Sequence, residues 1–280
     1  ISGLGLVEPL DLGKGLETIV GLLVSLVLFD GGLNLRFPGG AIKSIVLRIL
    51  SIRLIISLAA GFLAAHWFAG LGWSVAGVYS AIVLATGPTV VTPLVRQIRL
   101  ASPLSDVLEA EGLILEPIGA VLALLLLELV VGDLHGWREL FLGLLSRLGG
   151  GVLIGSIAGL LLSEGLKRLR SEPYIGIRLQ LTLGVIFLLY GVCEWLLPES
   201  GLPASVAAGF VVGQRPSTQA NELDKLIREL AQLAITMLFP LLAADVSWGE
   251  LSPLGWGGIT CVLFLMIVVR PIAVSIATYG

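Results

Sequence analysis

Two glutamates lie in a mainly apolar segment of the chain, residues 104–130. Glu111 and Glu116 are separated by Gly112, Leu113, Ile114 and Leu115. An apolar environment disfavours the charged form of a carboxyl group, so Glu116 is expected to hold a proton until a cation displaces it. One site that binds a proton and a cation in turn is sufficient to exchange them. The plainer alternative is a neutral glutamic acid that is hydrogen-bonded to a neighbouring helix.

The preceding apolar segment, 73–97, is interrupted by Thr86-Gly87-Pro88-Thr89. Pro88 has no backbone N–H and Gly87 resists helix formation, so nearby carbonyls lose their partners. These carbonyls and the Thr86 hydroxyl are hard oxygen ligands suited to an alkali cation. Pro117 frees a further carbonyl, one turn before it. An ordinary proline kink is the alternative interpretation of the break.

Depth in a membrane connects these features. At about 1.5 Å per residue, Thr86-Gly87-Pro88 and Glu116 fall near the same level, close to the bilayer midplane. Glu111 lies about a turn and a half nearer the cytoplasm, where it is an ion ligand, a partner for a cation or part of a funnel. The sequence therefore predicts an ion path.

Two further charges lie within apolar segments, Asp30 in 16–34 and Arg270 in 254–280. An unpaired charge is costly at such depth, so Asp30 and Arg270 are the preferred ion pair, with Glu111 as a competitor for the arginine. Arg53 also lies deep, and its side chain is expected to extend toward the membrane surface together with Arg48.

The composition indicates a polytopic helical membrane protein. Of 280 residues, 56% are hydrophobic and 13% charged, with a mean hydropathy of +1.00, whereas soluble domains are about a quarter charged. Apolar segments are predicted at 16–34, 41–69, 73–97, 104–130, 138–162, 174–197, 201–213, 223–247 and 254–280. Most of the 17 Lys and Arg residues lie in alternate connections. This pattern predicts nine crossings, with Ile1 outside and Gly280 at the cytoplasmic face.

Other kinds of chemistry are poorly supported. His66 and His135 lie at segment ends, Cys193 and Cys261 lie in separate apolar segments, and no hydrolase, phosphate-binding or nucleic-acid-binding motif occurs. We expect no enzyme activity, no nucleic-acid partner and no cofactor or metal beyond a transported cation. Glycines at 151, 155 and 159 indicate tight helix packing within the bundle or, alternatively, a subunit interface.

Four separated motifs resemble monovalent cation:proton antiporters of the NhaP/NHE type. They are Leu28-Phe29-Asp30-Gly31-Gly32-Leu33, the Thr86-Gly87-Pro88 break, Glu109-Ala110-Glu111-Gly112 followed by Glu116-Pro117, and Arg270. The resemblance covers nearly the whole chain, roughly the third to the eleventh span of a thirteen-span protein. It implies a chain that lacks spans at both ends.

The resemblance also implies roles for residues. Glu116 matches the ion- and proton-binding aspartate of the family, Glu111 a nearby glutamate, and Thr86 the threonine of the unwound segment. Asp30 and Arg270 match residues thought to hold the core together. The sequence departs from the family pattern at three polar positions, which are Gly87, Gly112 and Leu115 here. These departures bear on cation selectivity and affinity.

The implied fold is all-α, a truncated NhaA/NhaP-like inverted-repeat antiporter with about nine transmembrane helices, one of them discontinuous. Residues 41–130 would form part of the ion-binding core, 138–247 mostly dimerisation or scaffold helices, and 254–280 the start of a second core repeat. The implied function is exchange of Na⁺, K⁺ or Li⁺ for H⁺ across the cell membrane by a homodimer, through alternating access. A Na⁺-coupled symporter of another solute on a related fold is the alternative.

Overall fold

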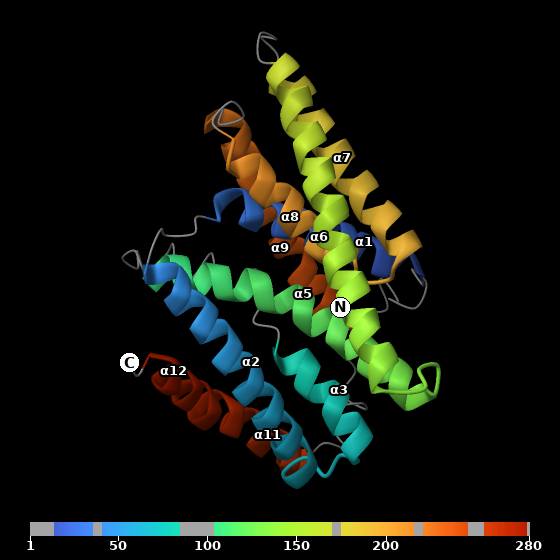
Figure 1. Cartoon of the computed structure of the whole chain (residues 1–280), viewed down its shortest axis with the longest axis vertical. Coiled ribbons are helices and arrows are strands. Elements are labelled where there is room, and N and C mark those ends of the chain that lie inside the picture. The colour runs from blue at the N-terminus through green and yellow to red at the C-terminus, as the bar shows by residue number, and fades with distance from the viewer. Residues whose placement is uncertain are drawn as a thin grey trace. The chain divides into compact units, whose positions relative to one another are not determined.

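The computed structural model describes residues 14–35, 41–84, 104–169, 175–215, 221–245 and 255–278. In these ranges the chain is helical apart from short connections (Figure 1). The elements are α1 (Lys14–Asn34), α2 (Ala41–Trp67), α3 (Trp73–Leu84), α5 (Leu104–Val131), α6 (Trp137–Arg168), α7 (Ile175–Leu196), α8 (Gly201–Gly213), α9 (Asn221–Asp245), α11 (Gly255–Phe264), the π-helical η5 (Leu265–Val269) and α12 (Arg270–Thr278). Each of the first eight predicted apolar segments overlaps one of these helices, and the ninth overlaps the three consecutive elements α11, η5 and α12. The all-α prediction is confirmed.

Six of the described helical segments are long and apolar enough to cross a membrane. They are Glu17–Asn34, Leu50–Trp67, Val107–Val131, Trp137–Arg168, Gly176–Leu196 and Gly255–Ala273. Helices α3 and α8 are apolar but shorter. A multi-pass membrane protein is thus confirmed, while the side of the membrane that each end faces stays a prediction.

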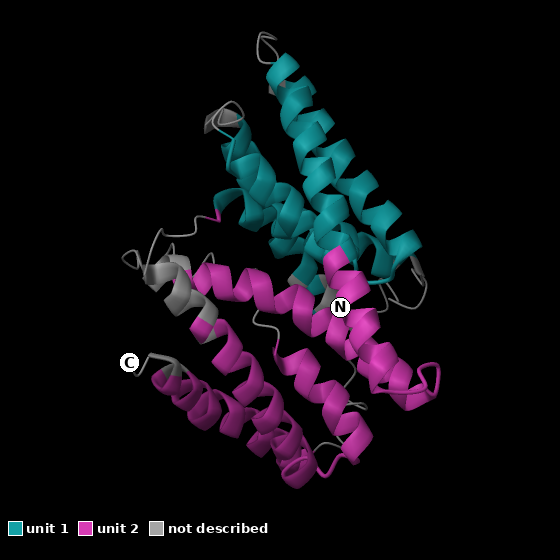
Figure 2. Ribbon diagram, viewed as in Figure 1, with its two compact units in different colours: residues 1–34, 150–251 teal, residues 35–149, 252–280 magenta. Residues whose placement is uncertain are grey.

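The chain forms two compact units, shown in teal and magenta in Figure 2. Unit 1 contains Ile1–Asn34 and Gly150–Leu251, and unit 2 contains Leu35–Gly149 and Ser252–Gly280. Helix α6 therefore begins in unit 2 and ends in unit 1. The stretches 41–130 and 254–280, predicted to take part in an ion-binding core, lie together in unit 2, but their function stays a prediction.

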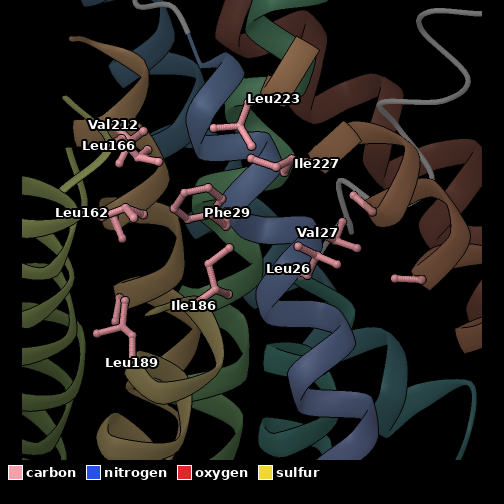
Figure 3. Close-up of a cluster of buried hydrophobic side chains, with 14 of the residues drawn as sticks. Leu26, Val27, Phe29, Leu162, Leu166, Ile186, Leu189, Val212, Leu223 and Ile227 are labelled. Carbon is pink, nitrogen blue, oxygen red and sulfur yellow. The ribbon is translucent and has the colours of Figure 1, made fainter. Parts of the chain in front are cut away.

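Unit 1 is built around contacts of α8 with α1 and α7, and of α1 with α9. Phe29 of α1, Leu166 of α6, Ile186 of α7 and Ile227 of α9 are buried in one apolar cluster (Figure 3). Each of these helices contributes buried apolar side chains to the cluster. The cluster explains why these segments, far apart in the chain, fold together.

Glycines allow three helices of unit 1 to approach at backbone distance. A Cβ atom on Gly155 of α6 would lie 2.1 Å from the Ala204 carbonyl oxygen of α8. A Cβ on Gly209 would lie 2.2 Å from the Phe29 carbonyl oxygen of α1. No larger residue fits at such contacts without moving the backbone. Of the two predicted uses of the α6 glycines, tight packing within the bundle is confirmed.

Unit 2 places α2 against α3, α5 and α12, and α3 against α5. The turn between α2 and α3 is fixed by His66, whose Nδ1 lies 2.8 Å from the Leu71 carbonyl oxygen. Its ring stacks on that of Trp73 at 3.6 Å between centroids. His66 is therefore a turn residue at a helix end, as predicted, and α2 and α3 leave this turn side by side.

Candidate functional site

Helix α5 carries both predicted carboxylates through the interior of unit 2. The helix continues through Pro117, which cannot donate a hydrogen bond to the Leu113 carbonyl one turn earlier. Gly112 and Pro117 are buried on the same helix. The structure thus places a proline immediately after Glu116 without ending the helix.

Glu116 has a buried carboxylate oxygen that is available to bind a proton or a cation. In the part of the chain that the structure describes, its Oε2 atom is buried and has no hydrogen-bond partner. A buried acceptor that is left unsatisfied is costly, and it is therefore a position that a proton or a cation would stabilise. The ion-binding role of Glu116 stays a prediction, as does the alternative of a neutral glutamic acid hydrogen-bonded to a neighbouring helix.

Glu111 forms an ion pair with Arg53 of α2, between Oε1 and Nη1. Glu111 is 3% exposed and Arg53 is 6% exposed. The expectation that Arg53 extends to the membrane surface is therefore wrong. The physical reason is that a carboxylate on the adjacent helix neutralises the guanidinium at its own depth, whereas reaching the surface leaves that carboxylate unpaired.

Arg270 lines a cavity of about 150 Å³ in unit 2, together with Arg53, Ser57, Val83, Leu265, Met266 and Val269. The π-helical turn η5 directly precedes Arg270 and Pro271. A π-helical turn contains one residue more than an α-helical turn and is often found at functional sites. It also accommodates Pro271, which has no backbone N–H to donate. The Arg270 residue itself is exposed, so among the described residues the buried guanidinium beside Glu111 belongs to Arg53.

Asp30 lies in unit 1 and is 6% exposed. Its Oδ1 accepts a hydrogen bond from Asn34 Nδ2 at 2.9 Å. Asn34 Oδ1 in turn accepts one from Arg228 Nη2 of α9 at 2.6 Å. Asn34 thus links the acid of α1 to a cation of α9. Because Asp30 and Arg270 belong to separate units, their predicted ion pair stays a prediction.

The predicted helix break at Thr86, Gly87 and Pro88 lies outside the described residues. Helix α3 is described as far as Leu84, which is buried, and it packs against α5. The ligand roles of Thr86, Gly87 and Gly112 stay predictions. Among the residues that are described, no group of three or more His, Cys, Asp and Glu side chains is arranged to hold a metal ion.

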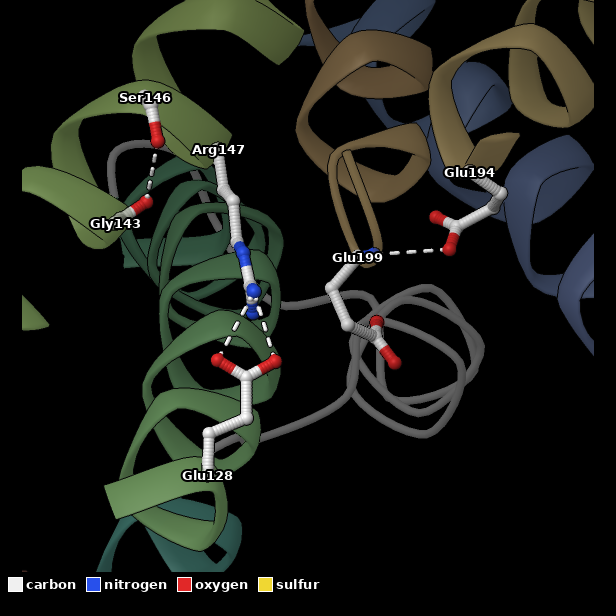
Figure 4. Close-up of polar contacts among 6 residues, drawn as sticks. All are labelled: Glu128, Gly143, Ser146, Arg147, Glu194 and Glu199. Atoms are coloured by element: carbon white, nitrogen blue, oxygen red, sulfur yellow. Dashed lines mark hydrogen bonds and ion pairs between the residues drawn. The ribbon is translucent and has the colours of Figure 1, made fainter. Parts of the chain in front are cut away.

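A second ion pair between helices was not anticipated from the sequence. Arg147 of α6 donates from Nη2 to both oxygens of Glu128 on α5, at 2.8 and 3.0 Å (Figure 4). Arg147 is one of the few basic residues outside the alternate, positively charged connections. Its carboxylate partner explains its position. The sequence signal was an acidic residue near the end of one apolar segment, Glu128 in 104–130, and a basic residue in the first half of the next, Arg147 in 138–162.

Comparisons with known proteins identify the family of the chain. Residues 1–280 match the family described as "Sodium/hydrogen exchanger, transmembrane". The chain is 26% identical to "Probable Na(+)/H(+) antiporter 2" of Methanocaldococcus jannaschii over 212 residues, which is 71% of this chain and 49% of that protein. It is 25% identical over 273 residues to "Na(+)/H(+) antiporter NhaH" of Halobacillus dabanensis, covering 93% of this chain and 66% of that protein.

The fold is also similar to a solved structure, that of the sodium proton antiporter MjNhaP1 from M. jannaschii. The TM-score is 0.75 at 20% sequence identity, over 99% of this chain and 69% of the other. The chain spans about half the length of the first of its curated relatives and about two thirds of the second. The match to the family model extends over the whole sequence, and the chain therefore belongs to the transmembrane sodium/hydrogen exchanger family.

Proposed function

We propose that the protein exchanges a monovalent cation for a proton across a membrane, and that Glu116 is the group that binds each in turn. The observation that carries the proposal is the buried Oε2 of Glu116, which has no hydrogen-bond partner in the described structure. A proton on this carboxyl neutralises it, and a cation bound to the carboxylate does the same. Because both states are neutral, neither is strongly excluded from an apolar interior.

Loss of helical hydrogen bonding beside Glu116 supports the proposal. Pro117 leaves the Leu113 carbonyl without its usual donor in α5. In this proposal Thr86, Gly87 and Pro88 supply further oxygen ligands from the segment that follows α3. Oxygen ligands of this kind suit Na⁺, K⁺ or Li⁺, and the mechanism requires no cofactor.

The wider setting follows the family resemblance. We infer a homodimer in the cell membrane, with the start of this sequence outside and its last residues at the cytoplasmic face, as the distribution of basic residues indicates. No observation among the described residues favours Na⁺-coupled symport of another solute. The matched family and the named relatives are exchangers.

The test uses the full-length protein reconstituted into liposomes that carry a pH gradient. Adding Na⁺, K⁺ or Li⁺ in separate experiments is expected to dissipate the gradient for at least one cation. The variant Glu116→Gln keeps the size of the side chain but cannot be ionised, and it is expected to abolish the response.

Glu164→Gln is the matched control, because Glu164 is half exposed and lies 3.9 Å from its nearest basic groups. It should retain the response of the unmodified protein. Full activity of Glu116→Gln would refute the assignment of Glu116. Cation-driven solute uptake without proton movement would refute exchange.

A further inference from the structure

All six tryptophans of the chain lie beside alternate connections between the apolar segments, and the other connections hold most of the Lys and Arg residues. Counted along the chain, they are Trp67 and Trp73 at the second connection, Trp137 at the fourth, Trp195 at the sixth, and Trp248 and Trp256 at the eighth. Trp248 lies outside the described residues. The two ends of the helices thus differ in chemistry, with indole rings at one end and cations at the other.

The five described tryptophans are exposed, from 53% for Trp73 to 83% for Trp195. Tryptophan is a residue that folding normally buries to a large extent. In the part of the chain that the structure describes, none of these indole N–H groups donates a hydrogen bond to another residue. Trp73 alone packs its ring on other aromatic rings, those of Phe62 and His66. Each tryptophan therefore presents a large apolar ring and an unused hydrogen-bond donor.

Three of the tryptophans lie at the same end of unit 2. The stacking of His66 on Trp73 joins the end of α2 to the start of α3. A Cβ atom on Gly257, near the start of α11, would lie 2.3 Å from the carbonyl oxygen of Phe68, directly after α2. Figure 1 shows the end of α2 together with the starts of α3 and α11. Trp67, the last residue of α2, therefore shares one level with the tryptophans of the other two helices.

Exposed apolar side chains continue from the tryptophans toward the middle of the helices. Residues three or four positions apart lie on one face of a helix. Two such stripes are Trp137, Phe141 and Leu145 on α6, and Trp195, Val192 and Leu188 on α7. A helix face that is apolar along its length and ends in an indole is typical of contact with a lipid bilayer, in which acyl chains cover the stripe and headgroups lie at the tryptophan.

We propose that these tryptophans anchor the chain in the boundary between the headgroups and the acyl chains of a single leaflet, the one opposite the basic connections. Within the acyl chains the indole N–H would lack an acceptor, and in water the ring would expose its apolar surface. The boundary supplies acyl chains for the ring and ester or phosphate oxygens for the N–H. The partner of this surface is phospholipid, and the surface fixes the level of unit 2 in the membrane.

The depth of each indole can be measured by fluorescence quenching. The full-length protein is reconstituted with phospholipids that carry bromine either near the glycerol or near the ends of the acyl chains. The difference in fluorescence between the unmodified protein and Trp137→Phe, Trp195→Phe or Trp256→Phe reports the tryptophan that was replaced. Each difference is expected to lose more intensity with the shallow bromine than with the deep one.

Leu188→Trp is the matched control, because it places an indole on the same exposed face of α7 as Trp195, about two turns nearer the middle of the helix. Its added fluorescence should be quenched more by the deep bromine. Equal depths for Trp195 and for this added indole would overturn the proposal. Quenching of the native tryptophans by aqueous iodide and by neither bromolipid would place them in water, and resistance to all three quenchers would show that protein covers them. Either result would also overturn it.

The restriction to one leaflet is tested with single cysteines in cells that express the full-length protein. Cys193 and Cys261 are buried, so an exposed cysteine introduced into the described part of the chain can be distinguished from them. Gly72→Cys, where nothing lies within 4 Å of the Cβ position, marks a connection that carries tryptophan. Lys225→Cys marks a basic connection, and the Lys225 side chain is 76% exposed.

A membrane-impermeant maleimide is applied to intact and to permeabilised cells. One of the two variants should react in intact cells, and the other only after permeabilisation. Reaction of both from the same side would refute the proposal, because tryptophans and basic residues would then share a leaflet. Neither experiment requires cation–proton exchange, so each decides the anchoring surface independently of the proposed function.

Discussion

The contact between α6 and α8 provides a quantitative test of the packing in unit 1. In Gly155→Ala, the new Cβ would lie 2.1 Å from the Ala204 carbonyl oxygen and 2.6 Å from its Cα. Both atoms belong to the backbone, so no side-chain rotation can relieve the contact. An ordinary contact begins at 3.4 Å, and α6 and α8 would have to separate locally by about 1.3 Å, the difference between 3.4 and 2.1 Å.

The same helix contains a matched control. Gly149→Ala adds the same methyl group to α6 at a position where nothing lies within 4 Å of the new atom. Replacing a helical glycine by alanine stabilises a helix by about 1 kcal/mol at either position. Overpacking costs about 1–3 kcal/mol, and an immovable backbone contact places Gly155→Ala at the upper end. We therefore expect the free energies of unfolding of the two variants to differ by about 3 kcal/mol.

The measurement is the loss of helical circular dichroism during denaturation of the purified protein in detergent micelles. Gly155→Ala should unfold at a lower denaturant concentration or temperature than the unmodified protein, and Gly149→Ala at an equal or higher one. If both variants unfolded at the same denaturant concentration or temperature, α6 and α8 would not be in backbone contact at Gly155. Such a result would refute the packing argument for the glycine stripe.

Two other predictions concern polar contacts between helices. Arg147→Gln removes the bidentate partner of Glu128 and is expected to reduce the free energy of unfolding by about 1–3 kcal/mol. The double variant with Glu128→Gln should recover part of that loss in the same denaturation assay, and a fully additive loss would contradict the pairing. Asn34→Leu interrupts the link from Asp30 to Arg228 and should cost about 1–2 kcal/mol. Adding Arg228→Gln should then cost little more, and a second loss of equal size would show that the three residues are not coupled.

The helices of this fold could be predicted well because hydropathy and chain breaks determine them locally. The segment predicted at 201–213 coincides with α8 (Gly201–Gly213), although it is too short for an ordinary membrane span. Polar and glycine-containing connections mark both of its ends. The predicted start of α2 at residue 41 is also confirmed. These boundaries depend on neighbouring residues and require no knowledge of tertiary contacts.

The partners of the buried charges could not be predicted in the same way. A count of residues from the end of a helix gives the depth of Arg53 but not the direction in which its side chain points. In a helix that direction changes by about 100° per residue, and the packing of neighbouring helices decides which face is buried. Arg53 was expected to reach the surface, and the structure instead places it against Glu111. Several charged residues lie at a similar depth in the membrane, so depth alone does not identify the partner of Arg53.

The charges of unit 2 also bear on the kind of cation that the proposed exchange would carry. The ion pair of Arg53 with Glu111 carries no net charge. Of the two glutamates Glu111 and Glu116, Glu116 is then the one that needs a proton or a cation to become neutral. A proton or a monovalent cation at Glu116 makes the buried group neutral. A divalent cation would leave one positive charge in an apolar interior, at a cost of several kcal/mol. In the proposed exchange, the charge balance of the α5 glutamates alone would thus favour a monovalent over a divalent cargo.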